Sequence, residues 1–123
     1  MHWSERTIIV VDDERLAGSA LRITLEQFGF RKVRVFVFAE DALKELDSIP
    51  EDAIWLIDMQ LNGIQGNELV EQIKDRSICV LVSADVQNKH FADDLDISFI
   101  QKPIMPEELQ GIFKQCFSQV QLL

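Results

Sequence analysis

The feature that most limits the fold of this chain is a regular alternation of short apolar runs with longer amphipathic stretches. Five runs consist mostly of β-branched or other strongly apolar residues, at 7–11, 33–37, 53–57, 78–82 and 97–100. Runs without polar alternation are typical of strands that are buried on both faces, as in a parallel sheet. Strands that alternate with helices pair in parallel through right-handed crossovers. The pattern therefore predicts an α/β fold, with a doubly wound five-stranded parallel sheet and helices on both faces.

The stretches between the runs have apolar residues at helical spacing. The stretch between 86 and 95 has the weakest helical pattern, because few apolar residues recur in it. Gly29 is expected to end the first helix and Pro106 to lie in the first turn of the last one. The expected apolar faces are Ala17, Ala20, Leu21, Leu25 and Phe28 in the first helix; Ala39, Ala42, Leu43 and Leu46 in the second; Leu69, Val70 and Ile73 in the third; and Leu109, Ile112, Phe113, Cys116, Phe117 and Val120 in the last.

Length and composition exclude several classes of protein. The 123 residues contain no linker or internal repeat, so residues 1–123 are expected to form one domain. No apolar run approaches the roughly 18 residues of a membrane span, and the start lacks a signal peptide, so we expect a cytoplasmic protein without a membrane partner. The net charge of −9 argues against direct binding of nucleic acid. Cys79 and Cys116 are interpreted as reduced core residues.

Polar residues follow four of the five predicted strands. Asp12 and Asp13 come after the first strand, Asp58 ends the third, Ser83 ends the fourth and Lys102 follows the fifth. In a doubly wound sheet, ligands bind in the crevice outside the carboxyl ends of the strands. We therefore expect these five side chains to converge on one edge of the sheet.

The chemistry open to such a set is narrow. Three neighbouring carboxylates repel one another and are stable as anions only beside a cation. Oxygen ligands that the protein supplies in small number suit Mg²⁺, which keeps water and phosphate oxygens in its shell. A lysine and a hydroxyl group can hold the other oxygens of a phosphoryl group, and Asp58 can act as a carboxylate nucleophile that forms an aspartyl phosphate.

Taken in order, these residues resemble the receiver domain of bacterial two-component response regulators. The resemblance runs from "IIVVDDE" through "WLIDMQLNGIQG" and "VLVSAD" to "FIQKPI" and covers nearly the whole chain. It implies a flavodoxin-like receiver fold with strand order 2-1-3-4-5. It also implies that Asp58 is the phosphoacceptor and a Mg²⁺ ligand. Asp13 would hold Mg²⁺ directly, Asp12 through water, and Gln60 would contribute its backbone carbonyl.

The resemblance assigns further residues to switching. It implies that Ser83 bonds a phosphoryl oxygen, that Lys102 pairs with the phosphoryl group, and that Phe99 changes rotamer with the active state. Pro103 follows Lys102 in the family's Lys-Pro pair, which is often a cis peptide. Gln60 and Asp85, each two residues beyond a pocket residue, fall where the family tunes the lifetime of the acyl phosphate. Where the family usually has proline, four residues after the acceptor, this chain has Asn62 within an Asn-Gly turn pair.

The function implied is that of a phosphoacceptor in a two-component or phosphorelay pathway. A sensor histidine kinase or a histidine phosphotransferase would supply the phosphoryl group, and the surface of the fourth helix, fifth strand and fifth helix would change toward a downstream protein target. Such a domain is no enzyme beyond assisting its own phosphorylation and dephosphorylation. Homodimer formation through the face of the last helix stays open, as does the choice between a stand-alone receiver and one cut from a larger regulator or hybrid kinase.

Two other functions are alternatives. The chain could be a receiver-like interaction module that works without phosphate, although such modules usually lose a pocket residue. It could also be a phosphatase of the haloacid dehalogenase type, although that family carries Asp-x-Asp on its first strand and this chain has "VDDER".

Single residues also have ordinary structural interpretations. Asp12 and Asp13 could cap a helix, Asp58 could begin a turn, and Ser83 could be a helix cap. Lys102 alone would be a solvated charge and Phe99 a core residue. The histidines His2 and His90 have no partner at metal-site spacing, and Asp93, Asp94 and Asp96 are expected to form a solvated face.

Overall fold

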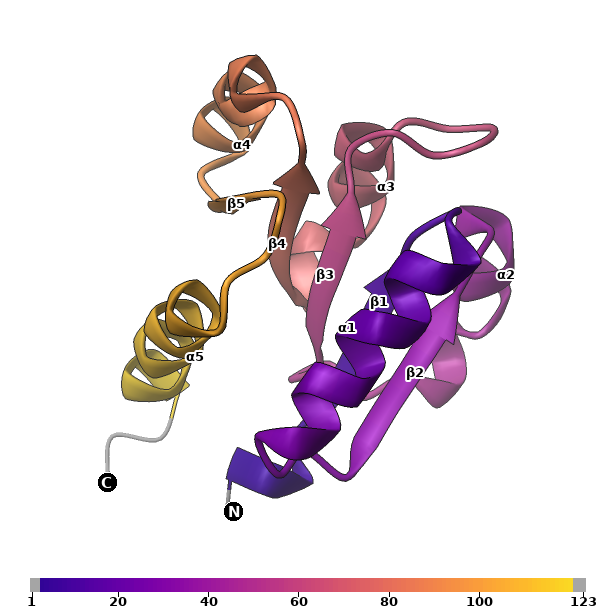
Figure 1. The fold of residues 1–123 in the computed structure, drawn as a ribbon. Helices are drawn as coiled ribbons and strands as arrows, with labels where there is room; N and C mark the ends of the chain where they lie inside the picture. The colour runs from indigo at the N-terminus through magenta and orange to yellow at the C-terminus, as the bar shows by residue number, and fades with distance from the viewer. Residues whose placement is uncertain (1–2, 121–123) are drawn as a thin grey trace.

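The computed structural model describes the backbone of residues 3–120 and the burial of residues 4–116. Its strands are β1 (Thr7–Val11), β2 (Lys32–Phe36), β3 (Ile54–Asp58), β4 (Ile78–Ser83) and β5 (Ser98–Gln101). They form one sheet in the order β2-β1-β3-β4-β5, and every neighbouring pair is parallel (Figure 1). The predicted fold class and strand order are confirmed.

Helices cover both faces of this sheet. Helices α1 (Arg15–Gln27) and α5 (Pro106–Val120) lie on one face, in front of the sheet in Figure 1, and α2 (Ala39–Lys44), α3 (Gly66–Ile73) and α4 (Lys89–Leu95) lie on the other. The weak helical pattern before β5 thus corresponds to α4 and to the 3-10 turn that precedes it at Val86–Asn88. None of the described helices is long and apolar enough to cross a membrane.

The core is two apolar layers separated by the sheet. All residues of the central strands β1 and β3 are buried. Because successive side chains of a strand point to opposite faces, Ile9 and Val11 pack with α2, α3 and α4, whereas Ile8 and Val10 pack with α1 and α5. This two-sided burial is the physical reason that the central strands β1 and β3 are almost entirely apolar before the acids at their ends.

Most predicted elements are found within one residue of their expected ends, with a few corrections. The strands expected at 33–37, 53–57 and 97–100 each shift by one position, and Asp58 and Ser83 are the last residues of their strands. Helix α1 ends at Gln27, so Phe28 follows the helix, and Ala20 is exposed. The buried small residue of α1 is instead Gly18, because its Cα lies so close to β2 that an added Cβ would be 2.9 Å from Val35 Cγ1.

A further difference concerns the second helix, whereas the described side chains of the last helix pack as predicted. Helix α2 ends at Lys44, and Leu46 lies in a separate 3-10 turn. In α5, Leu109, Phe113 and Cys116 are buried as expected, and Ile112 packs against the same cluster. The side chains of Phe117 and Val120 lie outside the described residues, as does His2.

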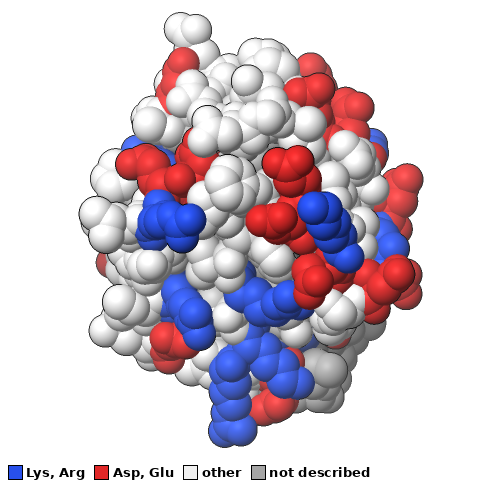
Figure 2. Space-filling view, turned by 90° about the vertical axis from the view of Figure 1, so that its right-hand side faces the viewer, with Lys and Arg blue, Asp and Glu red and all other residues white. Residues whose placement is uncertain are grey.

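Charged side chains of both signs lie together on the side of the molecule that carries the edge strand β2. Figure 2 shows this side, with Lys and Arg in its lower half next to Asp and Glu. Arg31 and Lys32 both lie within ion-pair distance of Glu5, and Arg34 pairs with Glu45 at 3.0 Å. Charged residues on an edge strand disfavour pairing with a strand of another chain.

The N-terminus of α3 touches the backbone at the end of β3. The N–H of Gly66 donates a 2.8 Å hydrogen bond to the carbonyl of Met59. A Cβ atom at Gly66 would lie 2.3 Å from the carbonyl oxygen of Asp58 and 2.7 Å from Met59 Cα. Neither contact involves a side chain that could move aside, so this position requires glycine.

Replacing Gly66 with alanine should therefore lower the free energy of unfolding by about 1–3 kcal/mol, the usual cost of overpacking. Denaturant unfolding of the purified variant measures this change. Gly111→Ala in α5 is the matched control, because no atom lies within 4 Å of an added Cβ there. Alanine should stabilise that helix by roughly 0.5–1 kcal/mol. Equal effects of the two substitutions would contradict the role of Gly66.

The two cysteines are free and buried, as predicted from the sequence. Burial raises the pKa of the Cys79 thiol to about 12. Burial also raises the pKa of the Cys116 thiol, although the positive charge of Arg6 opposes that rise. Since the thiolate is the reactive form, both groups should be inert in the folded protein.

We expect no measurable reaction of either thiol with a disulfide reagent at pH 7 in the native state. At a pKa of about 12, roughly one Cys79 in 100,000 is ionised at that pH, before access is considered. After unfolding in guanidinium, both thiols should react within the mixing time. The count of reacted thiols before and after unfolding checks this, and rapid reaction of a native thiol would show that its site opens readily.

Candidate functional site

The carboxyl ends of the strands bring the predicted residues together at one edge of the sheet. Asp12 and Asp13 directly follow β1, Asp58 is the last residue of β3, and Ser83 is the last residue of β4. Lys102 follows β5, and its backbone N–H donates a 2.8 Å hydrogen bond to the carbonyl of Ser83. Parallel pairing in this order therefore accounts for the convergence that the sequence predicted.

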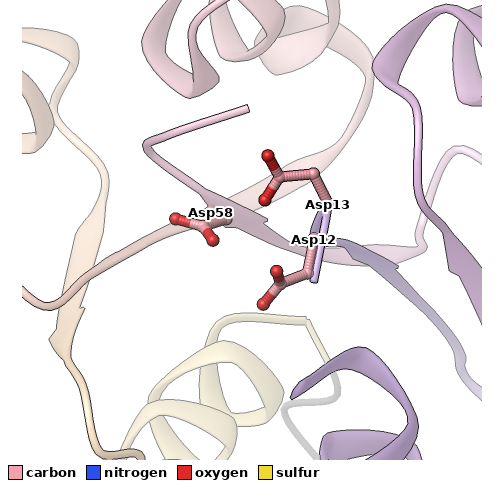
Figure 3. Close-up of side chains that lie close together, drawn as sticks. All are labelled: Asp12, Asp13 and Asp58. Carbon is pink, nitrogen blue, oxygen red and sulfur yellow. The ribbon is translucent and has the colours of Figure 1, made fainter. Parts of the chain in front are cut away.

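Three carboxylates form the acidic part of the site. Asp12, Asp13 and Asp58 each contribute an oxygen atom that lies within 4.8 Å of those of the other two. Figure 3 shows the three side chains at the ends of two neighbouring strands, around a common space. Asp12 and Asp58 are 5% and 8% exposed, so water screens their mutual repulsion only weakly.

Lys102 lies between two of these carboxylates. Its Nζ is 3.1 Å from Asp12 Oδ2 and 3.0 Å from Asp58 Oδ2. Burial would lower the pKa of Lys102, but the charges and hydrogen bonds of Asp58 and Asp12 together raise it, so the ammonium group stays charged. Burial raises the pKa of Asp58, while the hydrogen bond and charge of Lys102 and the backbone N–H of Gln60 oppose this rise.

Backbone N–H groups hold both buried carboxylates in place. Asp12 Oδ1 accepts a 2.9 Å bond from the N–H of Glu14, and Asp58 Oδ1 accepts a 3.1 Å bond from the N–H of Gln60. Asp12 therefore does not cap α1, because the N-cap is Glu14 and no side chain among the described residues bonds to the first N–H groups of that helix. The two oxygens of the Asp12 carboxylate thus have different partners: Oδ1 accepts from the backbone of Glu14 and Oδ2 lies beside Lys102.

Ser83 is 2% exposed and its hydroxyl oxygen accepts two hydrogen bonds. One comes from the backbone N–H of Asp85 at 3.0 Å and the other from the side-chain amide of Asn88 at 2.9 Å. The sequence did not indicate Asn88, because it lies in the segment with the weakest helical pattern. An amide side chain five residues after a strand-ending hydroxyl is too common a pattern to be diagnostic.

The remaining predicted residues surround this centre. Gln60 and Asp85 are exposed, and Asp85 also accepts a bond from the N–H of Gln87. Phe99 on β5 is half-buried and packs against the core layer of α2, α3 and α4. The peptide bond between Lys102 and Pro103 is cis. Gly63 in the Asn-Gly pair has φ 91°, so the loop after Asp58 turns where the sequence predicted.

The donor set fits a hard divalent cation. Carboxylate oxygens from three residues lie close enough to share one ion, and no nitrogen or sulfur ligand lies among them. Asp12 and Asp58 also lie against the cationic Lys102, which shows that this pocket already needs positive charge to offset its acids. Among the described residues, no other cluster of three metal-binding side chains is found.

Sequence comparison places this arrangement in a known family. The family model for the response regulator receiver domain matches residues 8–114. The transcriptional regulatory protein CssR of Bacillus subtilis (strain 168) is 29% identical over 109 residues, which are 84% of this chain and 47% of CssR. The chain therefore spans about half the length of this curated relative.

Solved structures show the same fold. A CheY-like receiver domain protein from Methanospirillum hungatei JF-1 superposes with a TM-score of 0.79 at 24% identity, over 94% of this chain and 95% of that one. The BeF3-activated receiver domain of DrrB superposes with a TM-score of 0.77 at 22% identity, over 93% of this chain and 98% of that one. With the match to the family model over most of its length, the chain belongs to the response regulator receiver domain family.

Proposed function

We propose that this chain is a phosphoacceptor that receives a phosphoryl group on Asp58 from a phosphohistidine of a sensor histidine kinase or histidine phosphotransferase. The observation that carries the proposal is the pairing of one lysine with two buried carboxylates at the edge where the third carboxylate and Ser83 also lie. Such a site can bind both the cation and the anion that phosphoryl transfer brings together.

Each residue has a distinct part in this reaction. Asp12, Asp13, Asp58 and the backbone carbonyl of Gln60 would hold Mg²⁺, which neutralises charge on the phosphoryl oxygens when bound. Lys102 would pair with a phosphoryl oxygen in place of a carboxylate oxygen. The Ser83 hydroxyl oxygen is the acceptor in both of its hydrogen bonds. Its O–H proton is therefore still available to donate to a phosphoryl oxygen.

The transfer itself makes one bond and breaks one bond. A carboxylate oxygen of Asp58 attacks phosphorus in line with the phosphorus–nitrogen bond of the phosphohistidine. The nitrogen leaves with the electron pair of that bond; the imidazole is then neutral if its other nitrogen carries a proton, and otherwise takes up a proton from water to become neutral. Water later attacks the phosphorus of the aspartyl phosphate, which releases inorganic phosphate and returns Asp58 to a carboxylate. The domain thus assists only its own phosphorylation and dephosphorylation and turns over no separate substrate.

The signal would leave through the side of the sheet formed by α4, β5 and α5. A phosphoryl group adds charge beside Ser83, and a shift of that residue leaves space that favours an inward Phe99. A downstream protein, or a second copy of the chain, would bind this side differently in the phosphorylated and unphosphorylated states. Gln60 and Asp85 are exposed beside the pocket and would set how readily water reaches the acyl phosphate.

Incubation with acetyl phosphate and Mg²⁺ should add one phosphoryl group, a gain of about 80 Da in intact mass. The gain should be absent in Asp58→Asn and in the presence of a chelator, because the first lacks the nucleophile and the second lacks the cation. Intact-mass spectrometry at neutral pH measures it. The Asp58→Asn protein should unfold at a denaturant concentration close to that of the native protein, so that a missing gain reflects lost chemistry.

No gain in mass for the unsubstituted chain, together with no binding of Mg²⁺, would overturn this proposal. It would favour a receiver-like interaction module that works without phosphate. A gain that persists in Asp58→Asn would place the acceptor on another residue.

A further inference from the structure

The hydroxyl of Ser83 is tied to the start of α4. Asn88 immediately precedes α4 and donates its side-chain amide to Ser83 Oγ at 2.9 Å, beside the 3.0 Å bond from the N–H of Asp85. A hydroxyl oxygen has two lone pairs, so these two donors use its full accepting capacity. The hydroxyl proton can still be donated, but a movement of the Ser83 oxygen toward a phosphoryl group at Asp58 would stretch the bond from Asn88.

Asn88 also lines a cavity. This cavity has a volume of about 360 Å³ and lies between the end of β3, the first turn of α3 and α4. Asn67 of α3 and Phe91 of α4 line it as well. Helices α3 and α4 pack against each other, so a small movement of α4 changes the width of this cavity.

Asn67, which lines the same cavity, carries an acceptor that lacks a donor. The side-chain oxygen of Asn67 is buried and has no hydrogen-bond partner among the described residues. Leaving a buried acceptor without a partner costs free energy, and most such groups in folded proteins are paired. Glu68, a neighbouring acceptor at the start of α3, already accepts a 2.9 Å bond from the N–H of Gln65.

We propose that Asn88 is a positioning residue that exchanges hydrogen-bond partners during switching: it donates to Ser83 in the unphosphorylated chain and to Asn67 Oδ1 once Ser83 has turned to the phosphoryl group. This inference rests on the proposed function, because phosphorylation of Asp58 is what draws Ser83 away. The exchange joins the first turns of α3 and α4, so the two helices move as a pair on the side of the sheet opposite α1 and α5.

The exchange gives Asn67 a role in one state alone. In the unphosphorylated chain the side-chain oxygen of Asn67 accepts no hydrogen bond, whereas in the phosphorylated chain it accepts one from Asn88. A group that contributes differently to two states shifts the equilibrium between them. Removing this oxygen should therefore disfavour activation without weakening the resting fold.

The test uses beryllofluoride with Mg²⁺ as a stable mimic of the phosphoryl group, and calorimetry to measure its affinity. Asn67→Ala should bind beryllofluoride about two- to tenfold more weakly, the effect of one hydrogen bond. Its resistance to denaturant without beryllofluoride should be unchanged or higher, because the substitution removes an unpaired buried acceptor. Gln72→Ala is the matched control, because it removes an exposed side-chain amide from the same helix. It should change neither the affinity for beryllofluoride nor the resistance to denaturant.

A double-substitution cycle separates this role from a merely structural one. In an Asn88→Ala background, Asn67→Ala should change beryllofluoride affinity by less than about twofold, because the donor is already absent. As a check that needs no substitution at Asn67, the side-chain amide resonance of Asn88 should shift when beryllofluoride binds to the unsubstituted chain. A resonance that stays in place would contradict the exchange.

The outcomes distinguish the two proposals. If the unsubstituted chain does not bind beryllofluoride with Mg²⁺, the proposed function fails and the exchange fails with it. If the chain binds but Asn67→Ala behaves like Gln72→Ala, the exchange alone is overturned. Equal weakening by Asn67→Ala with and without Asn88 would also overturn it, because Asn67 would then act through another partner.

Discussion

The repulsion among three carboxylates is the constraint on which the rest of this structure depends. Asp12 and Asp58 are nearly excluded from water and share one lysine, whose Nζ lies 3.1 and 3.0 Å from their oxygens. Taking one of several close acids out of water costs free energy unless positive charge lies beside it. The positive charge of Lys102 therefore offsets part of the repulsion among the carboxylates. A divalent cation bound at the same site would offset the remainder.

Rigid backbone segments hold the three carboxylates in place despite their mutual repulsion. Central strands that are buried on both faces end at the same edge, and backbone hydrogen bonds join their ends, as from Met59 to the carbonyl of Val82. Gly66 lets α3 begin directly against the backbone of Asp58. Such close backbone packing resists adjustment, so the acids keep their geometry despite their charge.

The same edge links the site to the helices that surround it. Ser83 is bonded to the segment that begins α4, and Lys102 is joined by its backbone to the end of β4. Hydrogen bonds, rather than the apolar core alone, therefore connect this edge of the sheet to two neighbouring elements. Because hydrogen bonds are directional and exchange partners in discrete steps, such links suit a domain with two states.

The sequence by itself determined the class of fold, the ends of most strands within one residue, and the set of Asp12, Asp13, Asp58, Ser83 and Lys102. It could do so because burial on both faces forces an apolar run, and polar residues stand out where such a run ends. Only the tertiary structure decided that Asn88 binds Ser83, that Gly18 rather than Ala20 is buried in α1, and that Gly66 contacts Asp58. These features depend on how closely separate elements approach one another. The local spacing of residue types does not specify such distances.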